Sequence, residues 1–241
     1  MSGHSHWHSI KHKKGATDAK KSKLFSKVSR LLSVAVKEGG QDPNANPKLR
    51  LAVEKAKLIN MPSANIEKAI KKGGGAADDK LEPIVFEAYG PGNVALIIEG
   101  ITDNKNRAIS EIKQVLNQHQ CKVVNEGSLR WLFEKKGVIV IESGNFSPEE
   151  RSELDLKIIE AGAEDFQWHD NALDVYTKIE DFDRVKKGLE GQGLKIDDSS
   201  LDWVAKEDIE IPREKKEACL RIFEALDDLD SVQEIYSNLK N

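Results

Sequence analysis

A run of three glycines, Gly73 to Gly75, divides the chain into two parts with different folding patterns. Before it, apolar residues recur every three or four positions, which is the spacing of amphipathic helices. After it, from about Leu81, short alternating runs typical of strands come between helical stretches. Glycines followed by Ala-Ala-Asp-Asp are typical of a linker. The sequence therefore predicts a helical front domain and an α+β body.

The front part is expected to form a basic three-helix domain over residues 19–75. Its first helix starts near Ala19 and ends at Gly39-Gly40, and Pro47 and Pro62 open the second and third helices. At 100° per residue, four cations of the first helix form a stripe beside its apolar face. They are Lys20, Lys23, Lys27 and Arg30. Residues 1–18 hold four of the six histidines and lack a periodic apolar face, which predicts a flexible basic arm.

The body contains one complete ferredoxin-like unit, in the order strand, helix, strand, strand, helix, strand. Its elements are expected at residues 137–142, 148–161, 164–168, 172–178, 181–190 and 194–204. The preceding segment, 93–133, supplies only a strand, a helix and two strands, the last of them at 128–134. A four-element fragment would leave a sheet edge unpaired and one side uncovered, so the helix at 213–226 and the strand at 232–236 are expected to complete it.

These patterns predict an α+β multidomain fold. An N-terminal three-helix domain is followed by two ferredoxin-like α/β sandwich domains, the last inserted into the middle one. The expected boundaries are 1–18 for the arm, 19–75 for the helical domain, 81–135 plus 208–241 for the discontinuous middle domain, and 136–207 for the inserted domain.

Charge is divided between the same two parts. Residues 1–75 carry 16 Lys and Arg against 5 Asp and Glu, whereas residues 76–241 carry 21 against 36. The net charge of −4 for the whole chain conceals this difference. A basic module on an acidic body indicates a polyanionic partner, and nucleic acid is the expected one.

The candidate phosphate contacts lie in the arm, along the helices of the front domain, and at the start of a helix near residue 104. Free backbone N–H groups at a helix start favour an anion. Ordinary capping by Thr102 or Asp103 is the alternative explanation there. The arm's tryptophan either stacks on a base or docks on the helical domain. The candidates are Trp7, Lys11, His12, Lys13, Lys14, Lys20, Lys23, Lys27, Arg30, Arg50, Lys68, Lys71, Lys72, Lys105 and Arg107.

No constellation in the sequence indicates catalysis, a cofactor or a metal, so a nonenzymatic protein is expected. His4, His6 and His8 alternate, but no carboxylate or cysteine completes a metal site. Cys121 and Cys219 are expected to be reduced and buried. The other two histidines, His119 and His169, and acidic runs such as Asp227-Asp228 are expected at the surface. The start lacks the apolar core of a secretion signal and no apolar run could span a bilayer, which predicts a cytoplasmic protein without membrane contact.

Several stretches resemble the YebC/PmpR family. The resemblance covers the helical and middle domains, and the length of the chain matches the whole family pattern. It implies three domains with a helical N-terminal module. The stretches are Gly3 to Trp7, Ile10 to Lys14, Asn46 to Arg50, Asn60 to Pro62, Ile66 to Gly73, Tyr89 to Gly92, Thr102 to Arg107 and Gly127 to Trp131.

For its function, the resemblance implies transcriptional regulation through DNA binding. Relatives also resemble translation factors that act at the ribosome on stalled, proline-rich stretches, and a mitochondrial relative activates translation of a respiratory oxidase subunit. The sequence has no helix-turn-helix or zinc-finger spacing, and phosphate contacts carry no sequence information. DNA and ribosomal RNA therefore both remain candidate partners, and a protein-interaction scaffold is a third reading. No small-molecule substrate is indicated.

Overall fold

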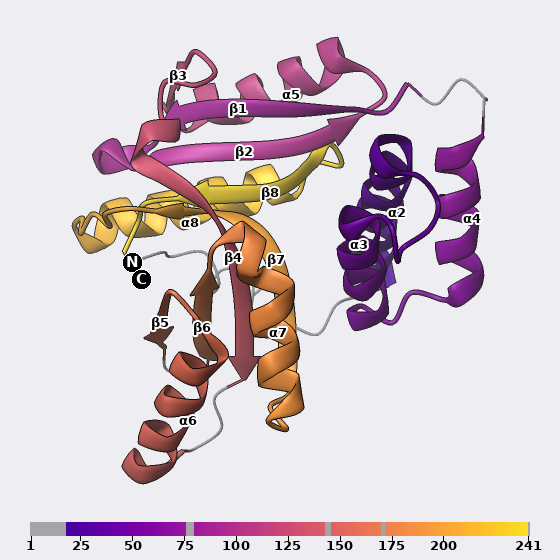
Figure 1. Ribbon diagram of the computed structural model, residues 1–241. Helices are drawn as coiled ribbons and strands as arrows, with labels where there is room; N and C mark the ends of the chain where they lie inside the picture. Colours follow the sequence, from indigo (N-terminus) through magenta and orange to yellow (C-terminus); the bar gives the residue numbers. More distant parts are fainter. Residues whose placement is uncertain (1–17, 76–79, 143–145, 170–171, 241) are drawn as a thin grey trace.

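The computed structural model describes residues 18–75, 80–142, 146–169 and 172–240. These residues form a helical domain and two four-stranded antiparallel sheets, each covered by helices on one face. In Figure 1 the helical domain lies beside the ends of β1, β2 and β8, and the second sheet lies below the first. The expected α+β fold, with the last domain inserted into the middle one, is confirmed.

The helical domain consists of α2 (Asp18–Gly39), α3 (Pro47–Leu58) and α4 (Ser63–Gly74). Its core includes the fully buried Leu32 and Leu49. Asn46 joins the first two helices, because its side chain accepts from Leu49 N at 3.1 Å and donates to Ala35 O at 2.7 Å. This N-cap therefore fixes where α3 starts relative to α2.

The expected linker begins later than its glycines suggest. Helix α4 continues to Gly74, and Gly73 is buried against α2. A Cβ atom at Gly73 would lie 2.6 Å from Ser33 O, which is closer than atoms can pack. Gly73 therefore serves a close approach of α4 to α2 and is not part of a linker.

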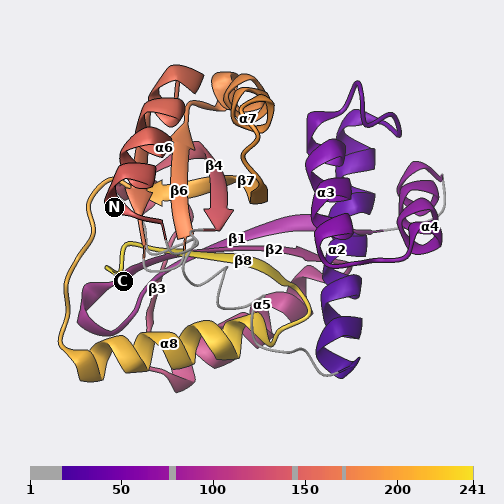
Figure 2. The ribbon, with the colours of Figure 1, turned by 90° about the horizontal axis from the view of Figure 1, so that it is seen from below.

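The first sheet contains β1 (Glu82–Tyr89), β2 (Ala95–Thr102), β3 (Lys122–Val124) and β8 (Val232–Ser237), in the order β3-β1-β2-β8. Helices α5 (Lys105–Gln118) and α8 (Arg213–Asp227) lie side by side on one face, as Figure 2 shows. Cys121 and Cys219 are free thiols in this core. Burial raises the pKa of each to about 11.

The strand expected at 128–134 does not belong to this sheet. Strand β1 lies between β2 and β3 and pairs with both. The short turn η1 (Pro91–Asn93) connects β1 to β2, and the two strands pair along the whole length of β1. Residues Arg130–Leu132 form a 3-10 turn, η2, and Phe133 begins a strand of the second sheet. The middle domain thus has a ferredoxin-like arrangement in which β1, its N-terminal strand, takes the position between β2 and β3 that was expected for residues 128–134.

The second sheet contains β4 (Phe133–Glu142), β5 (Asp165–Trp168), β6 (Ala172–Thr177) and β7 (Ile196–Ala205), in the order β5-β6-β4-β7. Helices α6 (Pro148–Ala161) and α7 (Phe182–Gly191), with the turn η3 (Ile179–Asp181) before α7, cover one face. Ser147 and Glu150 form a capping box that starts α6. Phe133 and Ala205 pack with Ile97 and Tyr236 on the other face of the first sheet. This second core joins the two sheet domains.

Candidate nucleic-acid interface

Two of the predicted contact residues, Lys105 and Arg107, lie at the start of α5, and the others fall into three groups. Trp7, Lys11, His12, Lys13 and Lys14 lie outside the described residues. A second group lies on α2 and α3 and contacts the sheet domains. A third lies on α4 and at the start of α2, and its members Lys20, Lys68, Lys71 and Lys72 are exposed.

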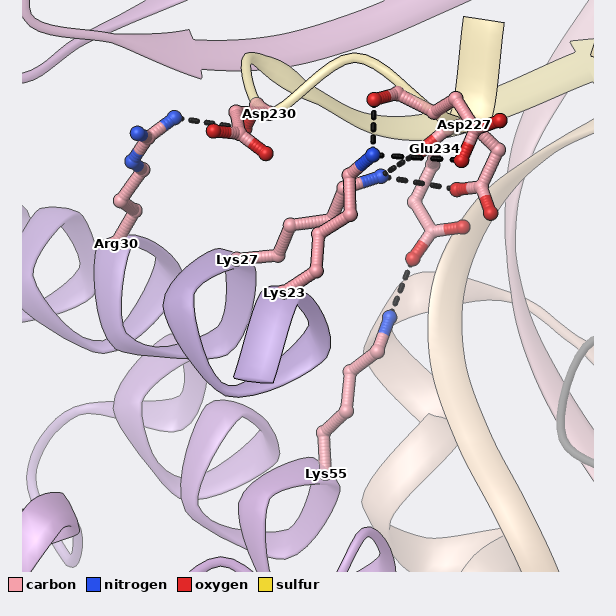
Figure 3. Close-up of polar contacts among 8 residues, drawn as sticks. Lys23, Lys27, Arg30, Lys55, Asp227, Asp230 and Glu234 are labelled. Atoms are coloured by element: carbon pink, nitrogen blue, oxygen red, sulfur yellow. Dashed lines mark hydrogen bonds and ion pairs between the residues drawn. The ribbon is translucent and has the colours of Figure 1, made fainter. Parts of the chain in front are cut away.

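Three cations of the α2 stripe, Lys23, Lys27 and Arg30, face the C-terminal end of α8, whereas Lys20 is exposed. Lys27 Nζ donates to Asp227 O at 2.6 Å and lies 2.9 Å from Asp227 Oδ1. Figure 3 shows these contacts beside those of Lys23 and Arg30. The Lys27 residue is only 5% exposed. It therefore has almost no surface left for a phosphate in this arrangement.

Two neighbours of Lys27 reach the same turn. Lys23 Nζ contacts the backbone oxygen of Asp228 and lies 3.3 Å from its Oδ1. Arg30 Nη1 donates to Asp230 O at 2.7 Å. The last carbonyls of a helix have no partner within the helix and carry the negative end of its dipole. The cations of α2 thus cap the C-terminal end of α8 from another domain.

Helix α3 contacts both sheet domains through ion pairs. Lys55 pairs with Glu234 of β8, and Arg50 Nη2 lies 2.5 Å from Asp183 Oδ2 of α7. Burial by itself lowers the pKa of Lys55, but the negative charges of Glu234 and of the nearby Asp198 and Asp202 outweigh burial and raise it. Lys55 is therefore held as a cation between α3 and the sheets.

One further ion pair at this interface has its cation on the body and its acid on the helical domain. Lys186 Nζ of α7 lies 2.5 Å from Glu54 Oε2 and 2.8 Å from Ser199 Oγ. Together these contacts fix the face formed by α2 and α3 against the acidic body. Four of the predicted phosphate contacts, Lys23, Lys27, Arg30 and Arg50, have intramolecular partners here.

Comparison with known proteins accounts for almost the whole chain. Residues 5–76 match the family model described as the TACO1/YebC protein N-terminal domain. Residues 81–239 match the model described as the TACO1/YebC second and third domain. The chain belongs to the TACO1/YebC family.

The similarity to relatives within the TACO1/YebC family extends over almost the whole of each protein. A probable transcriptional regulatory protein of Halothermothrix orenii is 44% identical over 240 residues, which are 99% of this chain and 94% of that protein. One of the same description from Pseudothermotoga lettingae is 44% identical over 100% of this chain and 94% of its own. The crystal structure of a conserved hypothetical protein from Aquifex aeolicus has a TM-score of 0.88 and 40% identity, covering 98% of this chain and 96% of that one.

In this TACO1/YebC chain, the helix start at Thr102 to Arg107 is capped by neither Thr102 nor Asp103. The side chain of Asn104 accepts from Arg107 N at 3.1 Å and is the N-cap of α5. Arg107 Nη2 lies 2.8 Å from Asp103 Oδ1. Lys105 is exposed. The predicted pair is therefore split between an exposed cation and a locally paired one.

Two expectations about polar surface residues are wrong. Asp227 is not simply a solvated helix end, because it pairs with Lys27. His169 is largely buried, and its Nε2 lies 2.8 Å from Asp174 Oδ2.

Trp131 of the turn Gly127 to Trp131 was assigned no role from the sequence, yet 66% of it is exposed. Its indole Nε1 donates to Ser128 O at 2.9 Å. The buried carboxylate of Glu87 holds this turn, since it accepts from Gly127 N and Leu129 N, both at 2.6 Å. The turn therefore presents a fixed aromatic side chain at the surface.

The residues that the structure describes contain no group of three or more His, Cys, Asp or Glu arranged to hold a metal ion. Among the same residues, no helix is long and apolar enough to cross a membrane.

Proposed function

We propose that this protein binds nucleic acid through its N-terminal arm and the exposed cations of its helical domain, and thereby regulates gene expression. In this proposal DNA is the target, transcription is the regulated process, and the protein acts in the cytoplasm by binding and not as an enzyme. The names of its relatives support a role in transcription. The acidic body repels bulk nucleic acid and so directs the basic domain towards it.

One observation carries the proposal. Lys23, Lys27 and Lys55 of α2 and α3 are paired with acids of the body, whereas Lys20, Lys68 and Lys71 are exposed on the helical domain. The sequence places three further lysines, Lys11, Lys13 and Lys14, in the arm that precedes α2. Exposed cations release condensed counterions when they neutralise phosphates, so they supply affinity that falls with salt.

The test replaces Lys11, Lys13 and Lys14 together with Ala. The slope of log K against log salt is negative, and each lost phosphate contact on duplex DNA makes it less steep by about 0.9, so its magnitude should decrease by about 3. A matched control replaces three exposed lysines of the body, Lys113, Lys187 and Lys215. We expect that control to leave the slope nearly unchanged, because in this proposal the lysines of the body make no phosphate contact. An unchanged slope in the arm variant would count against the proposal.

A translation factor that binds ribosomal RNA is the second candidate, supported by the family resemblance and by the same exposed cations, which do not distinguish DNA from RNA. Sedimentation of cell extract through a sucrose gradient separates the two. Comigration with ribosomes that disappears on deletion of residues 1–14 supports translation. Sequence-selective duplex binding at physiological salt supports transcription.

A protein-interaction scaffold is the remaining alternative. If residues 76–241 alone restored function in a deletion strain, the basic domain would be dispensable and the scaffold would replace both nucleic-acid proposals.

A further inference from the structure

A polar groove of about 450 Å³ lies between α2 and α4 and reaches Leu81 and Asp103, which adjoin the start of β1 and the end of β2. Ser26, Ser29 and Arg30 line it from α2. From α4 it is lined by Asn65, Lys68 and Lys72. On α4 these residues are three, four or seven positions apart, and on α2 Ser26 is three positions from Ser29 and four from Arg30, so each set lies on one helical face.

One end of this groove is closed by the close packing of α2 and α4. Gly73 lets α4 approach α2 at Ser33, and Ser33 Oγ donates to Ala69 O at 3.1 Å. Towards the other end the α2 side chains are serines, which are too short to fill the space. The groove is therefore a consequence of helix packing, with serines and Arg30 on the α2 side and Lys68 and Lys72 on the α4 side.

The charge in the groove is mainly positive. Arg30, Lys68 and Lys72 supply three cations, whereas Asp103 is the one carboxylate among its described lining residues and lies 2.8 Å from Arg107 Nη2. Arg30 also borders the α8 interface, where Nη1 donates to Asp230 O. A guanidinium carries five N–H donors, and that bond uses one of them. Arg30 can therefore serve both the interface and a ligand in the groove.

Cations combined with hydroxyl and amide donors are the groups that hold phosphate oxygens in proteins. The volume lies at the lower end of the roughly 300–1,000 Å³ of ligand pockets, which suits one nucleotide unit and not a folded partner. We propose that the groove between α2 and α4 is a phosphate site that takes one phosphodiester of a nucleic-acid strand. This inference rests on the proposed function, because it places a specific contact within that binding surface.

The first experiment compares two charge-matched double variants of the full chain. K68A/K72A removes two groove cations, and K57A/K71A removes two exposed lysines of the same domain outside the groove. Binding of a fluorescent single-stranded oligonucleotide should weaken about tenfold more in the groove variant, because charge-assisted hydrogen bonds are lost in addition to charge. Equal weakening would overturn the groove site and leave the proposed function standing.

A second comparison keeps the charge constant. S26A/S29A removes two hydroxyls of the groove, and S22A/S63A removes two exposed hydroxyls elsewhere on the same helices. We expect the groove variant to bind the oligonucleotide about fivefold more weakly, with an unchanged salt slope. Identical affinities of the two variants would contradict a built phosphate site. Circular dichroism of all four double variants checks that each is folded.

Inorganic phosphate distinguishes a backbone phosphate from a free one. Phosphate titrated into the protein should shift the amide signals of residues 26–30 and 65–72, and K68A/K72A should abolish those shifts. Phosphate binding as tight as oligonucleotide binding would identify a free-phosphate site and overturn the strand assignment. If the unmodified protein bound no oligonucleotide, the proposed function would fail. Shifts in these two segments would then support the phosphate site, and their absence would overturn it as well.

Discussion

Two sides of the helical domain carry similar cations in different surroundings. On the side formed by α2 and α3, Lys27 and Lys55 are enclosed by carboxylates and carbonyls of the body. On the side of α4, Lys68 and Lys71 are exposed to solvent. The comparison shows that a basic composition alone does not locate a phosphate-binding surface. The tertiary arrangement decides which cations hold domains together and which remain available to a ligand.

The physical difference between the two sides is desolvation. A buried cation is stabilised only while its partners stay in place, so losing one partner leaves an uncompensated charge. An exposed cation keeps its water, and its interactions are screened by salt within about 10 Å at 0.1 M. Variants on the first side should therefore affect folding and domain contact, and variants on the second side should affect binding.

Removing Lys27 should have the largest effect on stability. K27A leaves Asp227 and the carbonyls at the end of α8 without their ammonium partner, at a cost of about 3 kcal/mol in the free energy of unfolding. Urea denaturation followed by fluorescence measures it. The control K20A removes an exposed lysine two turns away and should change stability by less than about 0.5 kcal/mol. Equal stabilities of K27A and K20A would remove the distinction between the two sides.

A substitution at Gly73 tests the close packing of α4 against α2. G73A places a Cβ atom 2.6 Å from Ser33 O, so α4 must move away from α2. Overpacking of this kind costs about 1–3 kcal/mol, and thermal unfolding should show a lower Tm. The control G191A adds a methyl group at the end of α7, where nothing lies within 4 Å, and should leave Tm nearly unchanged. A G73A variant as stable as G191A would contradict the close approach.

The thiol of Cys219 reports on the α8 helix that the α2 cations hold. Since burial raises its pKa to about 11, little thiolate exists at pH 8, and alkylation of the native protein should be slow. The rate should rise with pH up to about 11 as the thiolate forms. Mass spectrometry should show faster alkylation in K23A/K27A than in K20A/K21A at equal pH. Equal rates would mean that the cations do not hold α8.

Much of the fold could be predicted from local signals. The helix at 148–161 has a proline at its first position and a capping box, and both act within a few residues. The C-terminal strand was expected beside the first sheet because an open edge required a partner, and β8 pairs with β2. The strand expected at 128–134 failed because periodicity does not show which strand takes the central position of a sheet.

The candidate site was less predictable than the fold. Helical spacing correctly brought Lys23, Lys27 and Arg30 to one face of α2. It could not show that residues about 200 positions later would meet that face. Nor could the sequence show that Gly73 is a packing residue, because the same glycine suits a linker. The docking of the α2 cations and the packing of Gly73 both depend on contacts between distant parts of the chain, which local sequence patterns do not show.

The division between docked and exposed cations is tested most directly by the salt dependence of nucleic-acid binding in two charge-matched variants. K20A/K68A removes two exposed lysines, and K23A/K27A removes two lysines paired with the end of α8. For duplex DNA, the magnitude of the negative slope of log K against log salt should decrease by about 2 in K20A/K68A and stay unchanged in K23A/K27A. An equal decrease in both variants would contradict the division between docked and exposed cations.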